Sequence, residues 1–251
     1  MPFLKNILFD WEGVPDKNIF PFNIPSIKGL SCLQLKSNVT FFIGENGSGK
    51  STLLEAIALK CGFKLMGGGS GTLLSAYEDA YTLEHVIRLS WMPKIKTGFF
   101  LRAETFYDYA NYIDDLAKDP DNDAGEVYRP YGGKSLHQQS HGESFISLFM
   151  NRFKKRGVYL LDEPEAALSP QRQLAFLRIM RQLDKSDRGQ FIIATHAPIL
   201  MAYPGATLLN FDVSPLAEIA YEDTAHFYIT KRFLNHREHF LRELFHDEEE
   251  G

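Results

Sequence analysis

The sequence predicts an α/β fold in which a mostly parallel central sheet is flanked by helices, with an antiparallel β portion near the N-terminus. Short runs rich in β-branched and aromatic residues, which are typical of buried strands, alternate with longer segments of helical periodicity. One such run, Val39–Ile43, leads through a glycine-rich turn directly into a helical segment. Strands that alternate with helices form parallel sheets with helices packed on their faces, which is the basis of the prediction.

The first part of the chain is expected to be rich in strands. Phe3–Trp11 and Cys32–Ile43 carry strand-like runs that are separated by a proline-containing segment. The glycine-rich turn is followed by a predicted helix over 52–61, in which the apolar residues recur on one face. Two further strand-like runs are expected at Val86–Trp91 and Thr97–Leu101.

Helical periodicity dominates the middle of the chain and returns at its end. Apolar residues recur at helical spacing in Glu104–Lys118 and over 143–156, so we predict a helix in each. The helix predicted at Pro170–Leu183 has a proline in its first turn, where the missing N–H is tolerated. His226–Phe245 is expected to form one helix or a pair of helices.

Three buried strands are predicted between these helices. Val158–Leu161 and Gln190–Thr195 are short apolar runs that lie on either side of the helix at 170–183. Thr207–Phe211 forms a third run, beyond a Pro-Gly turn. This alternation is what places the three strands in one parallel sheet.

Composition and charge exclude several classes of protein. The chain has 251 residues, of which 44% are hydrophobic and 24% charged, as in a globular protein with a sizeable core. No apolar run approaches the ~20 residues that a membrane span requires. The net charge of −5 argues against a surface built broadly for nucleic acid. The two cysteines suggest reduced thiols, and the N-terminus lacks the pattern of a secretory signal, so we expect a cytoplasmic protein.

The turn over 44–52 has the pattern of a phosphate-binding loop, Gly-x-x-x-x-Gly-Lys-Ser. Backbone N–H groups in such a loop, together with the positive end of the helix, form a site for a polyphosphate. Lys50 would place a charge near the β- and γ-phosphates, and Ser51 would ligate Mg²⁺. A chance glycine-rich turn would not explain the order of strand, loop and helix. The expected nucleotide-binding residues are Gly44, Asn46, Gly47, Ser48, Gly49, Lys50, Ser51 and Thr52.

Two carboxylates follow directly on the strand predicted at 158–161. A short apolar strand that ends in acids is the expected partner of a phosphate loop. Asp162 would hold the Mg²⁺ near Ser51, and Glu163 would orient or deprotonate the water that attacks the γ-phosphate. Acids also end strands without any catalytic role, and the phosphate loop upstream is what favours the functional interpretation.

The order of the motifs resembles that of the ABC-type ATPases. The run Asp-Glu-Pro-Glu-Ala-Ala-Leu-Ser-Pro over 162–170 resembles the Walker B and D-loop segment of that family, and the phosphate loop resembles its Walker A motif. His196, at the end of a predicted strand, matches the switch histidine, although a lone histidine in this position is often structural. The segment over 139–144, Gln-Ser-His-Gly-Glu-Ser, resembles the ABC signature and opens a predicted helix.

The resemblance implies roles for several residues. Glu163 and His196 would be catalytic, and Leu168 and Ser169 would form the D-loop. Residues Ser140, His141, Gly142 and Glu143 would form a signature that acts in trans, on the nucleotide of a second subunit. The signature departs from Leu-Ser-Gly-Gly-Gln, and a serine replaces the D-loop acid.

No clear Q-loop stands between the phosphate loop and the signature. Glu104 is the nearest candidate for the residue that senses the metal and the water, so we include it as a candidate metal ligand beside Ser51 and Asp162. The alternative is that Glu104 is an acid at a helix N-terminus, which the helix dipole favours. For Arg102 we favour an ordinary surface ion pair over contact with phosphate.

The resemblance also implies an assembly and its ligands. ATP and Mg²⁺ would be held between two copies of the chain in a head-to-tail homodimer that works as a conformational switch. Lys50 and Ser140 are too close in the chain for long coiled coils, and Gly98–Glu104 and 222–227 resemble a group of compact, stand-alone SMC-like predicted bacterial ATPases. We therefore expect a soluble ATPase without direct membrane insertion, whose partner is a protein or DNA in a DNA-linked or defence-type process. The alternatives are the nucleotide-binding subunit of an ABC transporter and an ATP-dependent scaffold that does not hydrolyse.

We expect the chain to form a single ABC-type ATPase domain, 1–251, with three parts. Residues 1–65 and 157–215 would form the nucleotide-binding core. Residues 66–156 would form an inserted helical subdomain that bears the signature, and 216–251 a C-terminal helical segment with an acidic tail.

Overall fold

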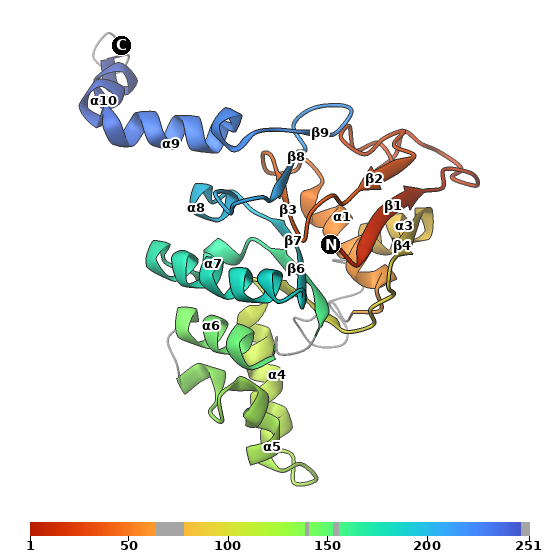
Figure 1. Cartoon of the computed structure of the whole chain (residues 1–251), viewed down its shortest axis with the longest axis vertical. Coiled ribbons are helices and arrows are strands. Elements are labelled where there is room, and N and C mark those ends of the chain that lie inside the picture. The colour runs from red at the N-terminus through yellow and green to blue at the C-terminus, as the bar shows by residue number, and fades with distance from the viewer. Residues whose placement is uncertain (64–77, 139–140, 153–155, 247–251) are drawn as a thin grey trace.

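The computed structural model describes residues 1–63, 78–138, 141–152 and 156–246, and their strands form two sheets (Figure 1). In the larger sheet, five strands run parallel and the last one is antiparallel to its neighbour. The predicted mostly parallel central sheet is therefore confirmed. In spatial order, its strands are β5 (Gly98–Arg102), β6 (Gly157–Asp162), β7 (Gly189–Ala194), β3 (Val39–Ile43), β8 (Thr207–Asn210) and β9 (Ala217–Glu218).

The smaller sheet is the predicted antiparallel portion. Its central strand, β1 (Leu4–Phe9), pairs with β2 (Cys32–Gln34) on one side and β4 (Ile87–Trp91) on the other. The segment Cys32–Ile43, in which strand-like runs were expected, is divided between β2 and β3, which belong to different sheets. The polar Lys-Ser-Asn stretch between them provides the break, since polar residues in a row do not suit a continuous buried strand.

The predicted helices are present, with bounds that differ by a few residues. The expected C-terminal segment is a pair of helices, and the short helices over 78–86, 124–128 and 198–201 were not expected from the periodicity. The helices are α1 (Lys50–Lys60), α3 (Glu78–Val86), α4 (Phe106–Lys118), α5 (Ala124–Tyr128), α6 (His141–Arg152), α7 (Pro170–Lys185), α8 (Pro198–Met201), α9 (Ala225–Asn235) and α10 (Arg237–His246).

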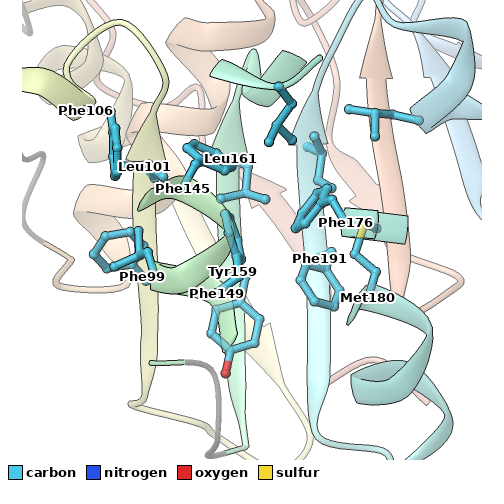
Figure 2. Packing of buried hydrophobic residues seen from close by; sticks show 14 of the residues in the cluster. Phe99, Leu101, Phe106, Phe145, Phe149, Tyr159, Leu161, Phe176, Met180 and Phe191 are labelled. Atoms are coloured by element: carbon cyan, nitrogen blue, oxygen red, sulfur yellow. The ribbon is translucent and has the colours of Figure 1, made fainter. Parts of the chain in front are cut away.

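The larger sheet separates two hydrophobic layers, because successive side chains of a strand point to opposite faces. Tyr159 and Phe191 point into the first layer, where Phe176 of α7 and the apolar residues of α4 and α6 meet them (Figure 2). Leu160 and Ile192 point into the second layer, which is closed by α1 and the smaller sheet. With both faces covered, the central strands β6 and β7 are buried along their length, which explains their continuous apolar character.

The segment predicted as an insertion contributes to both sheets. Residues 66–156 include β4 in the smaller sheet and β5 at the edge of the larger one. We therefore propose that the inserted helical part begins after β5, with α4. In Figure 1 the helices α4 and α5 lie at one end of the molecule, and α9 and α10 project at the other. None of the helices in the described ranges is long and apolar enough to cross a membrane.

Candidate functional site

The candidate site lies where β3, β6 and β7 end, at the carboxyl edge of the parallel strands. The loop between β3 and α1 is shaped by glycines. Gly49 has a φ of 96°, and a Cβ added there would lie 2.5 Å from Cγ2 of Ile24. A Cβ on Gly44 would lie 2.7 Å from Oδ1 of Asp212. Only glycine fits at these two positions, so the backbone can turn tightly into the first turn of α1.

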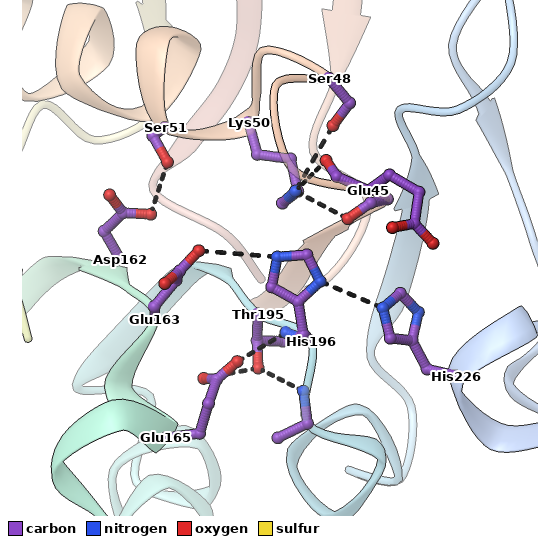
Figure 3. Close-up of polar contacts among 12 residues, drawn as sticks. Glu45, Ser48, Lys50, Ser51, Asp162, Glu163, Glu165, Thr195, His196 and His226 are labelled. Carbon is purple, nitrogen blue, oxygen red and sulfur yellow. Dashed lines mark hydrogen bonds and ion pairs between the residues drawn. The ribbon is translucent and has the colours of Figure 1, made fainter. Parts of the chain in front are cut away.

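Lys50 is held inside this loop (Figure 3). Its Nζ donates to the carbonyl oxygens of Gly44 at 2.7 Å and Glu45 at 2.8 Å, and reaches Oγ of Ser48 at 3.4 Å. Burial lowers the pKa of Lys50, and the nearby carboxylate of Asp212 is the largest of the charges that oppose this shift. An ammonium group in this position can exchange its carbonyl partners for the oxygens of a phosphate.

Ser51 and Asp162 meet across the edge of the sheet. The Oγ of Ser51 donates to Oδ1 of Asp162 at 3.0 Å. Mg²⁺ binds oxygen ligands at about 2.1 Å in an octahedron, so two neighbouring ligands lie about 3.0 Å apart. The spacing and the hydroxyl–carboxylate pair therefore fit adjacent ligand positions of one magnesium ion.

Glu163 has an unusual backbone conformation. Its φ of 49° and ψ of 50° are left-handed, and its N–H donates to the carbonyl oxygen of Ala194 at 2.9 Å. A left-handed non-glycine residue costs on the order of 1–2 kcal/mol, so the surrounding structure must impose it. Burial raises the pKa of the Glu163 carboxyl, and the charges of Asp162 and Glu104 add to this effect.

His196 follows β7 and lies opposite Glu163. Its Nε2 is 3.5 Å from Oε1 of Glu163, and its Nδ1 is 3.1 Å from Nε2 of His226 (Figure 3). Burial lowers the pKa of His196, and the positive charge of Lys50 acts in the same direction. The ring is therefore biased toward its neutral form at the centre of the site.

Glu165 joins the ends of β6 and β7. Its carboxylate accepts hydrogen bonds from Oγ1 of Thr195 at 2.8 Å and from the backbone N–H of His196 at 2.6 Å. Burial raises the pKa of this carboxyl. The contact fixes the backbone on which His196 stands. It was not predicted from the sequence, although Glu165 lies within the quoted Walker B run.

Arg102 is not the surface ion pair that we expected. It ends β5, in register with Asp162 on β6. Its Nε donates to Oδ2 of Asp162 at 2.8 Å, and its second guanidinium nitrogen is 2.6 Å from Oε1 of Glu55 on α1. The side chain is only 23% exposed, because β5 brings it beneath the candidate metal ligands. The guanidinium therefore pairs with two buried carboxylates at once, and its hydrogen bond to Oδ2 orients the side chain of Asp162.

Glu104 is exposed, and its predicted role as a metal ligand stays a proposal. Its charge contributes to the raised pKa of Glu163, which places it in the neighbourhood of the site. Within the described residues, Ser51 and Arg102 are hydrogen-bonding partners of the Asp162 carboxylate. Asp212, which sequence reasoning missed, accepts from the N–H of Glu45 at 2.7 Å and supports the far side of the loop.

The predicted signature lies at the start of α6, away from the phosphate loop. Ser140 lies outside the described residues, and His141 and Gly142 begin the helix. Glu143 is 62% exposed and lies 3.5 Å from Arg172 of α7 in an ion pair. Glu143 of the predicted signature and Ser169 of the predicted D-loop both line an open hollow of about 1150 Å³, so the structure brings these two residues to one surface.

The two predicted D-loop residues have opposite environments. Leu168 is buried in the first hydrophobic layer, and its carbonyl oxygen accepts from Nε2 of Gln173 at 3.1 Å. Ser169 is exposed and forms the N-terminal boundary of α7. Of these two residues, Ser169 is therefore the one whose side chain a partner could contact.

Two family models match separate parts of the chain. The model described as "AAA domain" matches residues 17–87, which include the phosphate loop. The model described as "AAA domain, putative AbiEii toxin, Type IV TA system" matches residues 144–202, which include the two acids and His196.

Curated relatives are ATP-binding proteins. A probable branched-chain amino acid transport ATP-binding protein of Archaeoglobus fulgidus is 29% identical over 161 residues, which cover 59% of this chain. The chain spans 66% of that relative's length, just under two thirds. An energy-coupling factor transporter ATP-binding protein of Mycoplasma capricolum is 23% identical over 78% of this chain and 72% of its own length.

A solved structure has the same fold. The structure of cbiO1 from Clostridium perfringens, described as part of the ABC transporter complex cbiONQ, matches with a TM-score of 0.53 and 16% identity. The match covers 95% of this chain and 97% of that chain, so the similarity extends over both sheets and the helices between them.

Proposed function

We propose that this chain, which has the fold and the motif order of the ABC-type P-loop ATPases, binds ATP with Mg²⁺ and hydrolyses it to ADP and phosphate. One observation carries the proposal. Lys50, Ser51, Asp162, Glu163 and His196 come from separate segments and converge on one edge of the sheet. These groups supply a phosphate-binding cation, a pair of metal ligands, a base and a donor.

Each group has a role that its geometry allows. Lys50 would release the carbonyl oxygens of the loop and hold phosphate oxygens instead. Ser51 and Asp162 would hold Mg²⁺, which neutralises charge on the phosphates when it is bound. Glu163 would accept the proton of the attacking water, and its raised pKa makes it a stronger base than an ordinary carboxylate.

A homodimer would complete the site. The N-terminus of α6 offers N–H groups and a positive dipole end to an anion, and it lies beside Ser169 on a surface apart from the phosphate loop. Two copies related by a twofold axis would place this surface of each chain against the phosphate loop of the other. ATP would then add contacts across the interface, and hydrolysis would remove them.

The curated relatives favour a transporter role over the DNA-linked or defence-type switch that we expected from the sequence. Both relatives described above are named as ATP-binding proteins of transport systems. We therefore propose, as a second candidate, that the chain is the nucleotide-binding subunit of a transporter and that its partner is a membrane protein. Affinity purification of the Glu163→Gln variant with ATP, from membranes and from the soluble fraction, separates the two roles. Recovery of a membrane protein supports the transporter role, and ATP-dependent retention on DNA contradicts it.

A steady-state ATPase assay tests the enzymatic part of the proposal. Loss of general-base catalysis typically lowers the rate 10²–10⁴-fold, so Glu163→Gln should lower kcat by about 10³-fold. Glu238→Gln, an exposed carboxylate on α10, is the matched control and should keep full activity. Equal rates for the wild-type protein and Glu163→Gln would instead favour an ATP-binding scaffold that does not hydrolyse.

A further inference from the structure

His226 comes from a part of the chain outside the parallel sheet, yet its ring reaches the candidate site. It lies in the first turn of α9, and Figure 3 shows it beside His196 on the side opposite Glu163. The centroids of the two histidine rings are 5.2 Å apart, and the nitrogens that face each other are 3.1 Å apart. No motif in the sequence pointed to this contact.

The local structure holds His226 firmly. Thr224, which is buried, caps α9: its Oγ1 accepts from the N–H of Phe227 at 3.3 Å and donates to the carbonyl oxygen of Tyr221 at 2.8 Å. The ring of Tyr221, which lies in the 3₁₀ turn before α9, packs against the ring of Phe227 with centroids 4.6 Å apart. A capped and packed first turn restricts the backbone that carries His226, so its ring is presented to His196 in a defined position.

The contact requires that the two rings share one proton. Two neutral imidazoles form a hydrogen bond only if one nitrogen carries the hydrogen and the other is bare. Either Nε2–H of His226 donates to Nδ1 of His196, or Nδ1–H of His196 donates to Nε2 of His226. The first arrangement leaves the proton of His196 on Nε2, and the second leaves Nε2 bare.

The surroundings of Nε2 of His196 decide between the two arrangements. This nitrogen is buried, lies 3.5 Å from a carboxylate oxygen of Glu163, and has no hydrogen-bond partner among the described residues. A bare nitrogen would present its lone pair to the negative carboxylate, which is unfavourable. A protonated Nε2 is attracted by the carboxylate instead, and it remains able to donate to a further acceptor.

We propose that His226 is a positioning residue that donates its Nε2–H to Nδ1 of His196 and so fixes the tautomer and the orientation of His196. The Nε2–H of His196 is then directed between Glu163 and the phosphate loop. The inference rests on the proposed ATPase function for its acceptor, which would be the terminal phosphate of the nucleotide. His226 would act through His196, because its Nε2 is occupied by Nδ1 of His196.

Nitrogen-15 NMR of histidine-labelled protein at about pH 8, where imidazole is neutral, tests the pair without any ATP turnover. In the wild-type protein, His196 should carry its proton on Nε2, and its signals are assigned by their loss in His196→Gln. In His226→Phe, which keeps an aromatic ring but removes the donor, His196 should become a mixture of tautomers. His236→Phe, at the exposed far end of α9, is the control and should leave the signals of His196 unchanged.

Kinetics test the consequence for hydrolysis. Loss of one neutral hydrogen bond of average strength corresponds to about a tenfold change, so His226→Phe should lower kcat about tenfold with little change in KM. His226→Gln, whose amide N–H can occupy the place of the imidazole N–H, should recover part of the rate. Unfolding by urea, measured for the same variants, separates this effect from a loss of folded protein.

Each outcome decides the proposal. A proton on Nδ1 of His196 in the wild-type protein would overturn it, as would an unchanged tautomer in His226→Phe. A shifted tautomer with an unchanged kcat would also overturn the positioning role. A wild-type protein with no ATPase activity refutes the proposed function, whereas the NMR result still decides whether His226 fixes the tautomer.

Discussion

The phosphate-loop edge and the start of α6 differ in how completely one chain satisfies them. At the phosphate loop, Lys50 and Asp162 are 4% and 2% exposed, and each is held by several groups of the same chain. At the start of α6, Glu143 is 62% exposed and its ion pair with Arg172 is long, at 3.5 Å. The first region is held together by contacts within one chain, whereas the second presents polar groups outward. This difference is what we expect of the two halves of a site that is shared between two copies.

The largest loss of stability is expected when a buried charge at the phosphate-loop edge is removed. Arg102→Met would leave Asp162 and Glu55 buried without the guanidinium between them. Breaking a buried ion pair costs 3–5 kcal/mol, and the partial exposure of Arg102 favours a value of about 3 kcal/mol.

Unfolding in urea measures this loss. The matched control is Arg88→Met, which removes an exposed ion pair with Asp10 and should cost at most about 1 kcal/mol. If the two variants lose equal stability, the phosphate-loop edge does not depend on internal charge pairing as we propose.

The second region should show the opposite behaviour. Glu143→Gln removes an exposed charge near a helix N-terminus, so we expect a loss of stability below about 1 kcal/mol. If the start of α6 contacts the nucleotide of a second copy, the same change should lower ATPase activity about tenfold, as one lost polar contact would.

Activity and urea unfolding, measured side by side, separate the two effects. Glu126→Gln, an acid in the first turn of α5, is the matched control and should change neither quantity appreciably. A loss of stability that accounts for the whole loss of activity would argue for a purely structural role of Glu143.

A gradual change of the ATPase rate is expected from pH. Glu163 must lose its proton to act as a base, and its pKa is raised, so the acidic limb of kcat/KM should lie above the ordinary value of 4.5. Lys50 must keep its proton, and its pKa is lowered, so the alkaline limb should begin below 10.5. The pKa of His196 is lowered, so the protonation of this ring should affect the rate only below pH 6.5.

Initial rates across the pH range check these signs, and outside each limb the rate should change about tenfold per pH unit. The residual activity of Glu163→Gln should lose the limb that belongs to Glu163. Persistence of an identical acidic limb in that variant would assign the limb to another group.

Much of the fold could be predicted from the sequence, and so could the part of the candidate site whose residues lie together in short runs of sequence. The phosphate loop and the acids after β6 are runs in which local chemistry and local structure coincide, so Lys50, Ser51, Asp162 and Glu163 could be selected directly. The parallel direction of the strands in the larger sheet could be predicted from the alternation of strands and helices along the chain.

Contacts between distant segments could not be predicted in this way. His226 touches His196 only because the first turn of α9 lies at the edge of the sheet, and Arg102 reaches Asp162 only because β5 lies next to β6. A single arginine after an apolar strand has the same local pattern whether it lies at the surface or beneath a metal site. The pairing and register of neighbouring strands decide between these cases, and the local residue pattern around one arginine does not reveal them.

Light scattering coupled to size-exclusion chromatography tests the central claim that two copies share the site. Glu163→Gln should retain ATP, so with ATP and Mg²⁺ its mass should double from the monomer value of 28.6 kDa. The double variant that also carries Lys50→Ala should stay monomeric, because it lacks the phosphate-binding cation. A Glu163→Gln protein that stays at the monomer mass at high concentration, with ATP demonstrably bound, would contradict the shared site.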